Sequence, residues 1–213
     1  MKKQITYLFI ISLLSISCAK EYYSCTPSVN EWVKQHKAMY ANIPRSQLAS
    51  FDRDKQSGLF VSFTPQQKAR IYQEKYDYLM GLEILSQKEK EQLTKLFQLV
   101  TPEIYQNEAN RTKFNILANE WEKETKELLG WSDSEIFLHT HTWLTLEEIE
   151  DVITRNMSYM GEVAFGRKPN CTCLYDTYCW FLSLGTETCA YGNCEEVLEC
   201  GIVGNSNCKG LCK

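Results

Sequence analysis

The sequence predicts a mainly α-helical protein, with a helical N-terminal domain followed by a small disulfide-rich C-terminal module. Two observations support this prediction. From residue 28 to about 156, apolar residues recur at steps of three and four behind helix-capping residues, as in amphipathic helices. Eight of the ten cysteines then fall within the last 43 residues, where few large apolar side chains are left to form a core. We therefore expect apolar burial to stabilise the first part and disulfides to stabilise the second.

The chain opens with the pattern of a bacterial secretory signal. Met1-Lys2-Lys3 is followed by an apolar run from Ile5 to Ile16, which is shorter than the roughly 20 residues that a membrane span needs. The segment Leu14-Ser15-Ile16-Ser17-Cys18 resembles a lipobox, in which the cysteine is lipidated and becomes the new N-terminus. We therefore expect residues 1–17 to be a lipoprotein-type signal peptide, and we expect Cys18 to carry the lipid that holds the protein on a membrane.

The alternative to lipidation of Cys18 is ordinary signal-peptide cleavage after Ala19. Ser17 and Ala19 have the small side chains of a signal-peptidase site, and Ser15 stands where a lipobox usually has leucine. Both routes export the protein. The expected location is the bacterial cell envelope, lipid-anchored in the outer membrane or at the surface, or the medium after ordinary cleavage. Residues 18–27 are expected to form a flexible tether.

Export determines how the clustered cysteines are interpreted. In an oxidising compartment paired cysteines persist as disulfides, whereas zinc sites usually contain Cys-x2-Cys pairs, which the tail lacks. We expect four disulfides within the tail, with a connectivity that the spacing leaves open. The partner of Cys25 also stays open, since lipidation of Cys18 removes the nearest candidate. The eight cysteines expected in disulfides are Cys171, Cys173, Cys179, Cys189, Cys194, Cys200, Cys208 and Cys212.

Capping signals divide the middle of the chain into consecutive helices. Ser28 is a candidate cap for the first helix. Thr64-Pro65-Gln66-Gln67 combines a capping threonine, a proline at the first helical position and a glutamine three residues after the cap. Ser86-Gln87-Lys88-Glu89 is a second capping box, and Pro102 interrupts the helical pattern behind it. Thr145-Leu146-Glu147-Glu148 opens the last predicted helix.

The longest predicted helix spans about residues 110–129 and ends at Gly130. Along Glu120–Glu127 opposite charges lie three and four residues apart, which predicts a solvated helix face rather than a carboxylate site. The short apolar run Leu59–Phe63 is consistent with a strand or an extended connection. The side of the long helix that we expect to be buried carries Phe114, Leu117, Trp121 and Leu128.

Charge limits the expected partners. The chain has 23 basic and 27 acidic side chains, and loss of a leader containing Lys2 and Lys3 makes the mature protein about −6. Nucleic-acid binding requires a basic patch, so we expect no nucleic-acid partner. An acidic chain also gains nothing from an anionic membrane surface beyond the lipid itself, so we expect membrane attachment only through the N-terminal lipid.

The sequence indicates no enzyme and no cofactor. Nucleophile-elbow, zinc-protease, phosphate-loop and dinucleotide-binding motifs do not occur in it. His139-Thr140-His141 contains the only closely spaced histidines, and an extended segment would place both rings on one face. Asp133 or Glu135 would then supply further zinc ligands. Two clustered ligands in an exported protein are more often loop residues, so we predict no metal site and no catalytic residues.

Residues 166–170, Gly-Arg-Lys-Pro-Asn, have the composition of a linker. They separate a helical domain at 28–165 from a disulfide-rich module at 171–213. Because the helical domain has its own caps and apolar faces and contains no cysteine, we expect it to fold by apolar burial without the module. The module should be ordered only when it is oxidised.

The residues of the module form a recognisable framework. It consists of the opening Asn170-Cys171-Thr-Cys173, Asp176 and Tyr178 ahead of Cys179, the step Cys200-Gly201, and Gly210 before Cys212. This arrangement resembles the bacteriocin fulvocin C-related proteins, which are exported bacterial proteins carrying a tail like that of fulvocin C, a small disulfide-rich bacteriocin. The resemblance covers about the last fifth of the chain. Thr177 and the longer apolar gap before Cys189 depart from the pattern.

The resemblance implies an exported, bacteriocin-like protein whose cystine-rich tail has antibacterial activity, and the lipobox-like segment adds the expected lipid anchor at Cys18. The tail itself carries about −3, whereas peptides that attack envelopes by charge attraction are cationic. A protein receptor on target bacteria is therefore the expected partner, with Trp180, Phe181 and Leu182 as the candidate contact surface; the same three residues would otherwise be the tail's small core. The alternative is a non-enzymatic cell-surface binding lipoprotein in which the cystine tail is a scaffold.

Overall fold

The computed structural model describes residues 23–24, 26–145, 148, 189–191 and 198–212. As predicted, this part of the chain is mainly helical. No helix within it is long and apolar enough to cross a membrane. The elements are α2 (Pro27–His36), α3 (Arg45–Leu48), α4 (Arg53–Ser62), α5 (Pro65–Gly81), α6 (Gln87–Phe97), η1 (Pro102–Tyr105), α7 (Glu108–Leu129), α8 (Asp133–Ile136), η2 (Phe137–His141), β1 (Cys189–Tyr191), β2 (Leu198–Cys200), η3 (Ile202–Gly204), β3 (Ser206–Asn207) and β4 (Gly210–Cys212).

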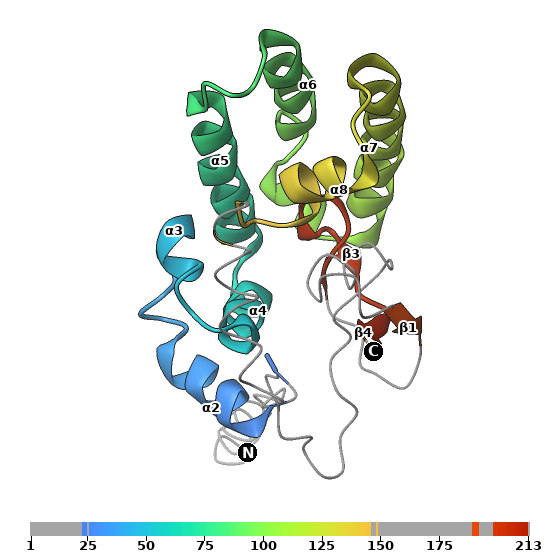
Figure 1. The fold of residues 1–213 in the computed structure, drawn as a ribbon. Helices are drawn as coiled ribbons and strands as arrows, with labels where there is room; N and C mark the ends of the chain where they lie inside the picture. The colour runs from blue at the N-terminus through green and yellow to red at the C-terminus, as the bar shows by residue number, and fades with distance from the viewer. Residues whose placement is uncertain (1–22, 25, 146–147, 149–188, 192–197, 213) are drawn as a thin grey trace, which may run out of the picture.

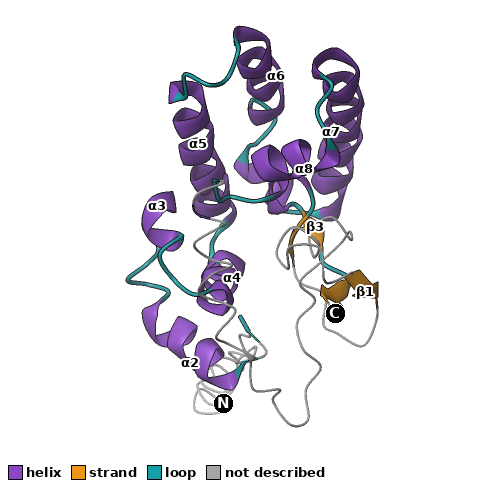
Figure 2. Cartoon of the chain, in the orientation of Figure 1, coloured by secondary structure: helices purple, strands orange, loops and turns teal. Residues whose placement is uncertain are grey.

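The helices α5, α6 and α7 stand beside one another at one end of the molecule (Figure 1). Helices α2 to α4 continue from the lower end of α5, and the short α8 and η2 segments lie between α5 and α7. The tail contributes two antiparallel pairs of short strands, β1 with β4 and β2 with β3 (Figure 2). The strands thus lie at one edge of a helical protein.

Local capping chemistry starts the long helices where the sequence predicts. Thr64 caps α5, and its backbone N–H donates to Gln67 Oε1 at 2.7 Å while its hydroxyl accepts from the Gln67 N–H at 3.3 Å. Ser86 and Glu89 form the same reciprocal capping box on α6. Gly130 ends α7 in the left-handed region at φ 70°, where glycine avoids the strain that a Cβ would cause. The first helix begins earlier than expected, at Pro27 behind Thr26.

The run Leu59–Phe63 is not a strand or an extended connection, and that prediction is wrong. Residues up to Ser62 belong to α4, whose N-terminus is capped by Asp52 accepting from the Lys55 N–H at 3.0 Å. Leu59 and Phe60 are both fully buried. A helix enclosed on several sides needs no polar face, and its short apolar runs cannot be distinguished from those of a buried strand.

The buried face of α7 also differs from the prediction. Phe114 and Trp121 are buried as expected, but Leu117 is 47% exposed and Leu128 is 61% exposed. The face that enters the core continues through Ala118 and Thr125, at steps of four, three and four from Phe114. The buried face carries the small Ala118 and the polar Thr125, whereas the larger Leu117 and Leu128 lie on the solvent side. The pattern of large apolar residues in the sequence therefore predicted the wrong face.

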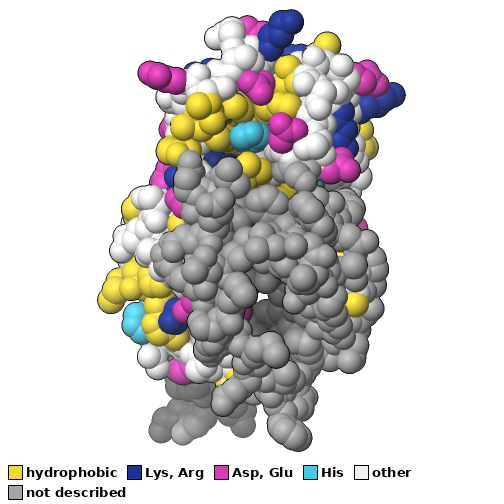
Figure 3. Space-filling model, in the orientation of Figure 1, with side chains coloured by type: hydrophobic (Ala, Val, Ile, Leu, Met, Phe, Trp, Pro, Cys, Tyr) yellow, Lys and Arg dark blue, Asp and Glu magenta, His cyan; other side chains and the backbone are white. Residues whose placement is uncertain are grey.

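On the face drawn in Figure 3, acidic and basic side chains are interspersed at the end of the molecule that α5, α6 and α7 form. Two ion pairs belong to this polar surface: Lys95 binds Glu124 between α6 and α7 at 2.6 Å, and Lys126 binds Glu122 within α7 at 2.6 Å. The charged outer sequence of α7 therefore forms a solvated helix face, as predicted.

The tail packs into the core of the helices. A disulfide joins Cys200 to Cys208, with Cα atoms 5.1 Å apart, and closes a loop of seven residues that we call the tail loop (residues 201–207). Ile202 and Val203 of the tail loop belong to the same buried cluster as the side chains of α4, α5, α6 and α7. The loop therefore completes the helical core rather than forming a separate core of its own.

Two further contacts fix the tail loop in this position. The hydroxyl of Tyr105, from η1, donates to the carbonyl oxygen of Val203 at 2.7 Å. Gly204 has φ 60°, and a Cβ on it would lie 3.0 Å from both Phe60 and Tyr72. Val203 itself is fully buried with φ 51°, a strained value for a β-branched residue. The tail loop thus fits closely into the helical core, while independent folding of the helices stays a prediction.

Candidate functional site

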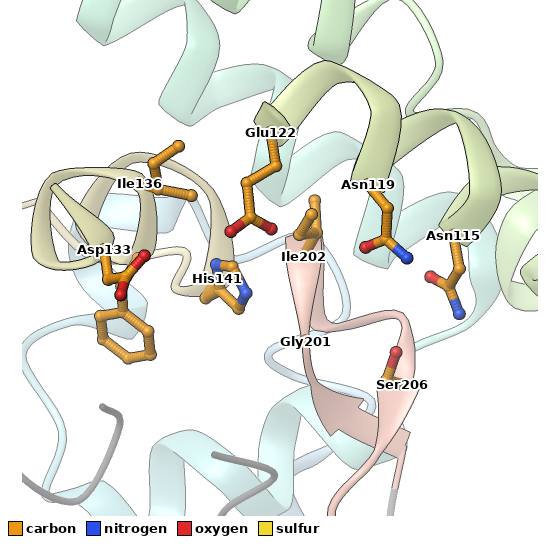
Figure 4. A pocket seen from close by; sticks show the side chains of 10 residues that line it. Asn115, Asn119, Glu122, Asp133, Ile136, His141, Gly201, Ile202 and Ser206 are labelled. Atoms are coloured by element: carbon orange, nitrogen blue, oxygen red, sulfur yellow. The ribbon is translucent and has the colours of Figure 1, made fainter. Parts of the chain in front are cut away.

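A pocket of about 390 Å³ opens between α7, the α8–η2 segment and the tail loop (Figure 4). Each of the three parts supplies one wall, so the pocket depends on the tail loop being docked. The described residues that line it are Asn115, Asn119 and Glu122 from α7, Asp133, Ile136, Phe137 and His141 from α8 and η2, and Gly201, Ile202 and Ser206 from the tail.

Helix α7 places three polar side chains along the pocket. Asn115, Asn119 and Glu122 follow one another at steps of four and three, so they share a helix face beside the buried stripe. The Asn115 amide oxygen accepts from the Nδ2 of Asn205 at 3.4 Å, and Asn205 is fully buried in the tail loop. This contact connects the α7 wall to the tail wall.

Lys126 forms ion pairs with both the α7 wall and the α8 wall of the pocket. Lys126 Nζ lies 2.6 Å from a carboxylate oxygen of Glu122 and 2.6 Å from one of Asp133. Hydrogen bonds to Asp133 and then to Glu122 raise the pKa of Lys126 above its usual value. Both acidic side chains of the pocket are thus partly neutralised by one ammonium group that holds them in place.

His141 forms the inner side of the α8–η2 wall. Burial, with the nearby charge of Lys75 as the next cause, lowers the pKa of His141 to about 4. The ring stacks on Phe137 with centroids 5.5 Å apart, and its Nδ1 lies 2.9 Å from the Thr140 hydroxyl. The imidazole is therefore neutral near pH 7 and is held in one orientation.

The two histidines do not share a face, so that expectation is wrong. Residues Phe137–His141 form a π-helical turn rather than an extended segment. His139 instead stacks on Trp131 at 4.8 Å, and burial lowers its pKa to about 4 as well. Among the described residues, no group of three or more histidine, cysteine or acidic side chains has an arrangement that could hold a metal ion.

The role of Lys75 was not evident from the sequence. Its side chain is fully buried, and Nζ donates to the carbonyl oxygens of Leu138 at 2.6 Å and Thr142 at 2.7 Å. Burial is the main cause that lowers the pKa of Lys75 well below its usual value, and Arg45 adds to the effect. Lys75 thereby holds the π-helical turn that carries His141. The signal in the sequence was a lysine within the apolar face of α5.

The predicted disulfide residues are covered in part. Cys200 and Cys208 form a disulfide, and Cys189 is disulfide-bonded as well. Cys212 lies in β4, in register with Cys189 of β1.

The last predicted helix is described only at Glu148, whose carboxylate accepts from the Thr145 N–H at 2.7 Å. The predicted features outside the described residues are the signal peptide, the linker, Cys18, Cys25, Cys171, Cys173, Cys179, Cys194 and the candidate contact surface Trp180, Phe181 and Leu182.

No protein-family model, curated protein or solved structure matches this chain. The function is therefore inferred from the pocket and the tail loop.

Proposed function

We propose that this chain is an exported, lipid-anchored binding protein of the bacterial cell envelope, with no catalytic activity and with its cystine-rich segment as an integral part of the fold. The observation that carries the proposal is the tail loop. Val203 lies fully buried among the helices, and Gly201, Ile202 and Ser206 supply one wall of the pocket. Releasing the tail as a free peptide would open both the core and the pocket.

The chemistry of the pocket favours binding over catalysis. The imidazole of His141, with a pKa of about 4, is a weak general base at neutral pH. The hydroxyl beside it belongs to Thr140, which is fully buried and donates to the Ile136 carbonyl oxygen at 2.6 Å. A hydroxyl in that position cannot reach a substrate as a nucleophile.

The disulfide supports the export part of the proposal. Structural disulfides persist in oxidising compartments, and the Cys200–Cys208 bridge closes a loop on which the core depends. A lipid on Cys18 would then keep the protein on a membrane, since a lipid-modified N-terminus is an anchor and not a span.

Lipid labelling of the N-terminus tests this proposal. In bacteria expressing the full chain with labelled palmitate, we expect the label on the protein and the protein in the membrane fraction. Cys18→Ala should abolish the label and release the protein from that fraction. Cys25→Ala is the matched control and should leave labelling unchanged. An unlabelled protein that begins at Lys20 would overturn the lipid anchor.

A second candidate function is bacteriocin-like killing through a receptor, and the specific observation that favours it is the cysteine framework from Cys171 to Cys212. The oxidised full chain, applied to lawns of diverse bacteria, should then inhibit growth. Trp180→Ala should remove inhibition while leaving thermal stability unchanged. Inhibition by neither the full chain nor its cleaved products would exclude this candidate.

A further inference from the structure

The pocket is lined by polar groups of several kinds and by three apolar side chains, which we call its floor. The polar groups are two amides, two carboxylates, one imidazole and one hydroxyl, and the floor consists of Ile136, Phe137 and Ile202. Amides, hydroxyls and neutral imidazoles both donate and accept hydrogen bonds, whereas carboxylates accept them. A ligand that carries many hydroxyl groups on a compact carbon frame can satisfy this mixture, because its C–H surface contacts the floor while its hydroxyls meet the rim.

The charges of the pocket narrow the ligand class. None of the described residues that line it is a lysine or arginine, and the nearby Lys126 is already paired with Glu122 and Asp133, so no free cation among the described residues would pair with a phosphate or carboxylate. The carboxylates of Glu122 and Asp133 already bind Lys126 at 2.6 Å each, which weakens their attraction for a cation. A neutral ligand therefore fits the electrostatics better than an anionic or a cationic one.

The walls are also held in place before a ligand arrives. Asn115 is hydrogen-bonded to the buried Asn205, Glu122 is held by Lys126, and His141 is stacked and hydrogen-bonded. Fixed side chains lose little rotamer freedom on binding, which favours affinity for a small polar molecule. The volume of about 390 Å³ falls in the range of small-ligand pockets, roughly 300–1,000 Å³.

We infer that this pocket binds a neutral polyhydroxylated molecule of the size of a mono- or disaccharide. The inference rests on the proposed binding function and names the ligand class of the same site. Helix α7 and the tail loop provide the hydroxyl-binding rim, and Ile136, Phe137 and Ile202 provide the apolar platform.

Titration of the oxidised full chain, followed by NMR and calorimetry, tests the inference. The neutral probes are glucose, N-acetylglucosamine and maltose; the charged probes are glucose 6-phosphate, glucuronate and glucosamine. At least one neutral sugar should bind and shift the side-chain amide resonances of Asn115 and Asn119. Its charged analogue should bind at least about tenfold more weakly, as expected when a charge loses hydration without gaining a partner.

Two variants on neighbouring positions of α7 serve as a matched pair. Asn119→Leu removes a rim amide and should weaken sugar binding about tenfold, the effect of losing roughly one hydrogen bond. Glu120→Leu adds the same apolar side chain at an exposed position that does not line the pocket and should leave affinity unchanged.

Three results would overturn the inference. If no neutral sugar binds, or if Asn119→Leu leaves affinity unchanged, the pocket is not the sugar site. If a charged probe binds best and Asn119→Leu abolishes its binding, the ligand class is wrong but the binding function stands. An unlabelled full chain that begins at Lys20 would instead count against the proposed lipid anchor and leave a pocket result intact.

Discussion

At the scale of single residues, buried polar groups determine the shape of the site. Lys75 is fully buried on α5 and donates to the carbonyl oxygens of Leu138, within the π-helical turn, and Thr142, directly after it. A π-helical turn is rare and leaves backbone groups unsatisfied unless another group binds them. The side-chain nitrogen of Lys75 supplies that donor, so one side chain on a regular helix holds the turn that carries His141.

Replacing this lysine tests its structural role. Lys75→Met keeps the apolar stem but leaves the carbonyls of Leu138 and Thr142 buried without a donor. We expect the free energy of unfolding in urea to fall by about 1–3 kcal/mol. Lys123→Met is the control, because Lys123 is 80% exposed and makes only a surface ion pair, so its change should stay within about 0.5 kcal/mol. A Lys75→Met protein as stable as the parent would contradict this role.

The two histidines predict a pH dependence of stability. In the folded protein the pKa of His139 and that of His141 are each lowered to about 4, from about 6.5 in the unfolded chain. The unfolded state therefore binds more protons between these values, and the folded state loses stability as the pH falls from about 6.5 to about 4. His139→Gln should reduce this slope in urea titrations. A slope that the variant leaves unchanged would show that other groups cause it.

At the scale of elements, the contact between η1 and the tail loop connects two segments far apart in sequence. Tyr105 is fully enclosed at its hydroxyl, and burial raises its pKa well above the usual value. Its donation to the Val203 carbonyl satisfies a backbone group that would otherwise be buried without a partner. Together with the Cys200–Cys208 disulfide, this hydrogen bond fixes the left-handed turn at Val203 and Gly204.

Removing only the hydroxyl of Tyr105 tests its hydrogen bond to the Val203 carbonyl. Tyr105→Phe should lower the free energy of unfolding by about 1–2 kcal/mol, because the Val203 carbonyl loses its donor in a dry environment. Tyr78→Phe is the matched control, since Tyr78 is 39% exposed and water can replace any partner of its hydroxyl. Chemical denaturation of both oxidised proteins measures the difference. Equal stability of the two variants would contradict a structural role for this hydrogen bond.

The elements also show what a sequence can predict. The capping boxes at Thr64 and Ser86 and the stop at Gly130 were predictable, because each depends on residues within four positions of one another. The helical state of Leu59–Ser62 and the π-helical turn at Phe137–His141 depend on contacts with distant segments. The local sequence pattern therefore predicted extended backbone at both places. The pocket was not foreseen for the same reason: its walls come from three separate stretches of chain.

At the scale of the whole molecule, the helices and the tail loop share one hydrophobic core. Burial of Ile202 and Val203 each contributes about 1.5–3 kcal/mol. The Cys200–Cys208 disulfide adds further stability by restricting the conformations of the unfolded chain. We therefore expect the protein to unfold as one cooperative unit in which the tail loop completes both the core and the pocket.

Thermal unfolding, followed by helical circular dichroism, of a chain that ends at Lys168 and of the oxidised full chain shows whether the tail loop and the helices unfold together. The truncated chain lacks the tail loop, so its midpoint should lie about 5–20 °C lower, and reductant should lower the midpoint of the full chain but not of the truncated one. A truncated chain that melts cooperatively at the same temperature as the full chain, with or without reductant, would contradict the claim and show two independent units.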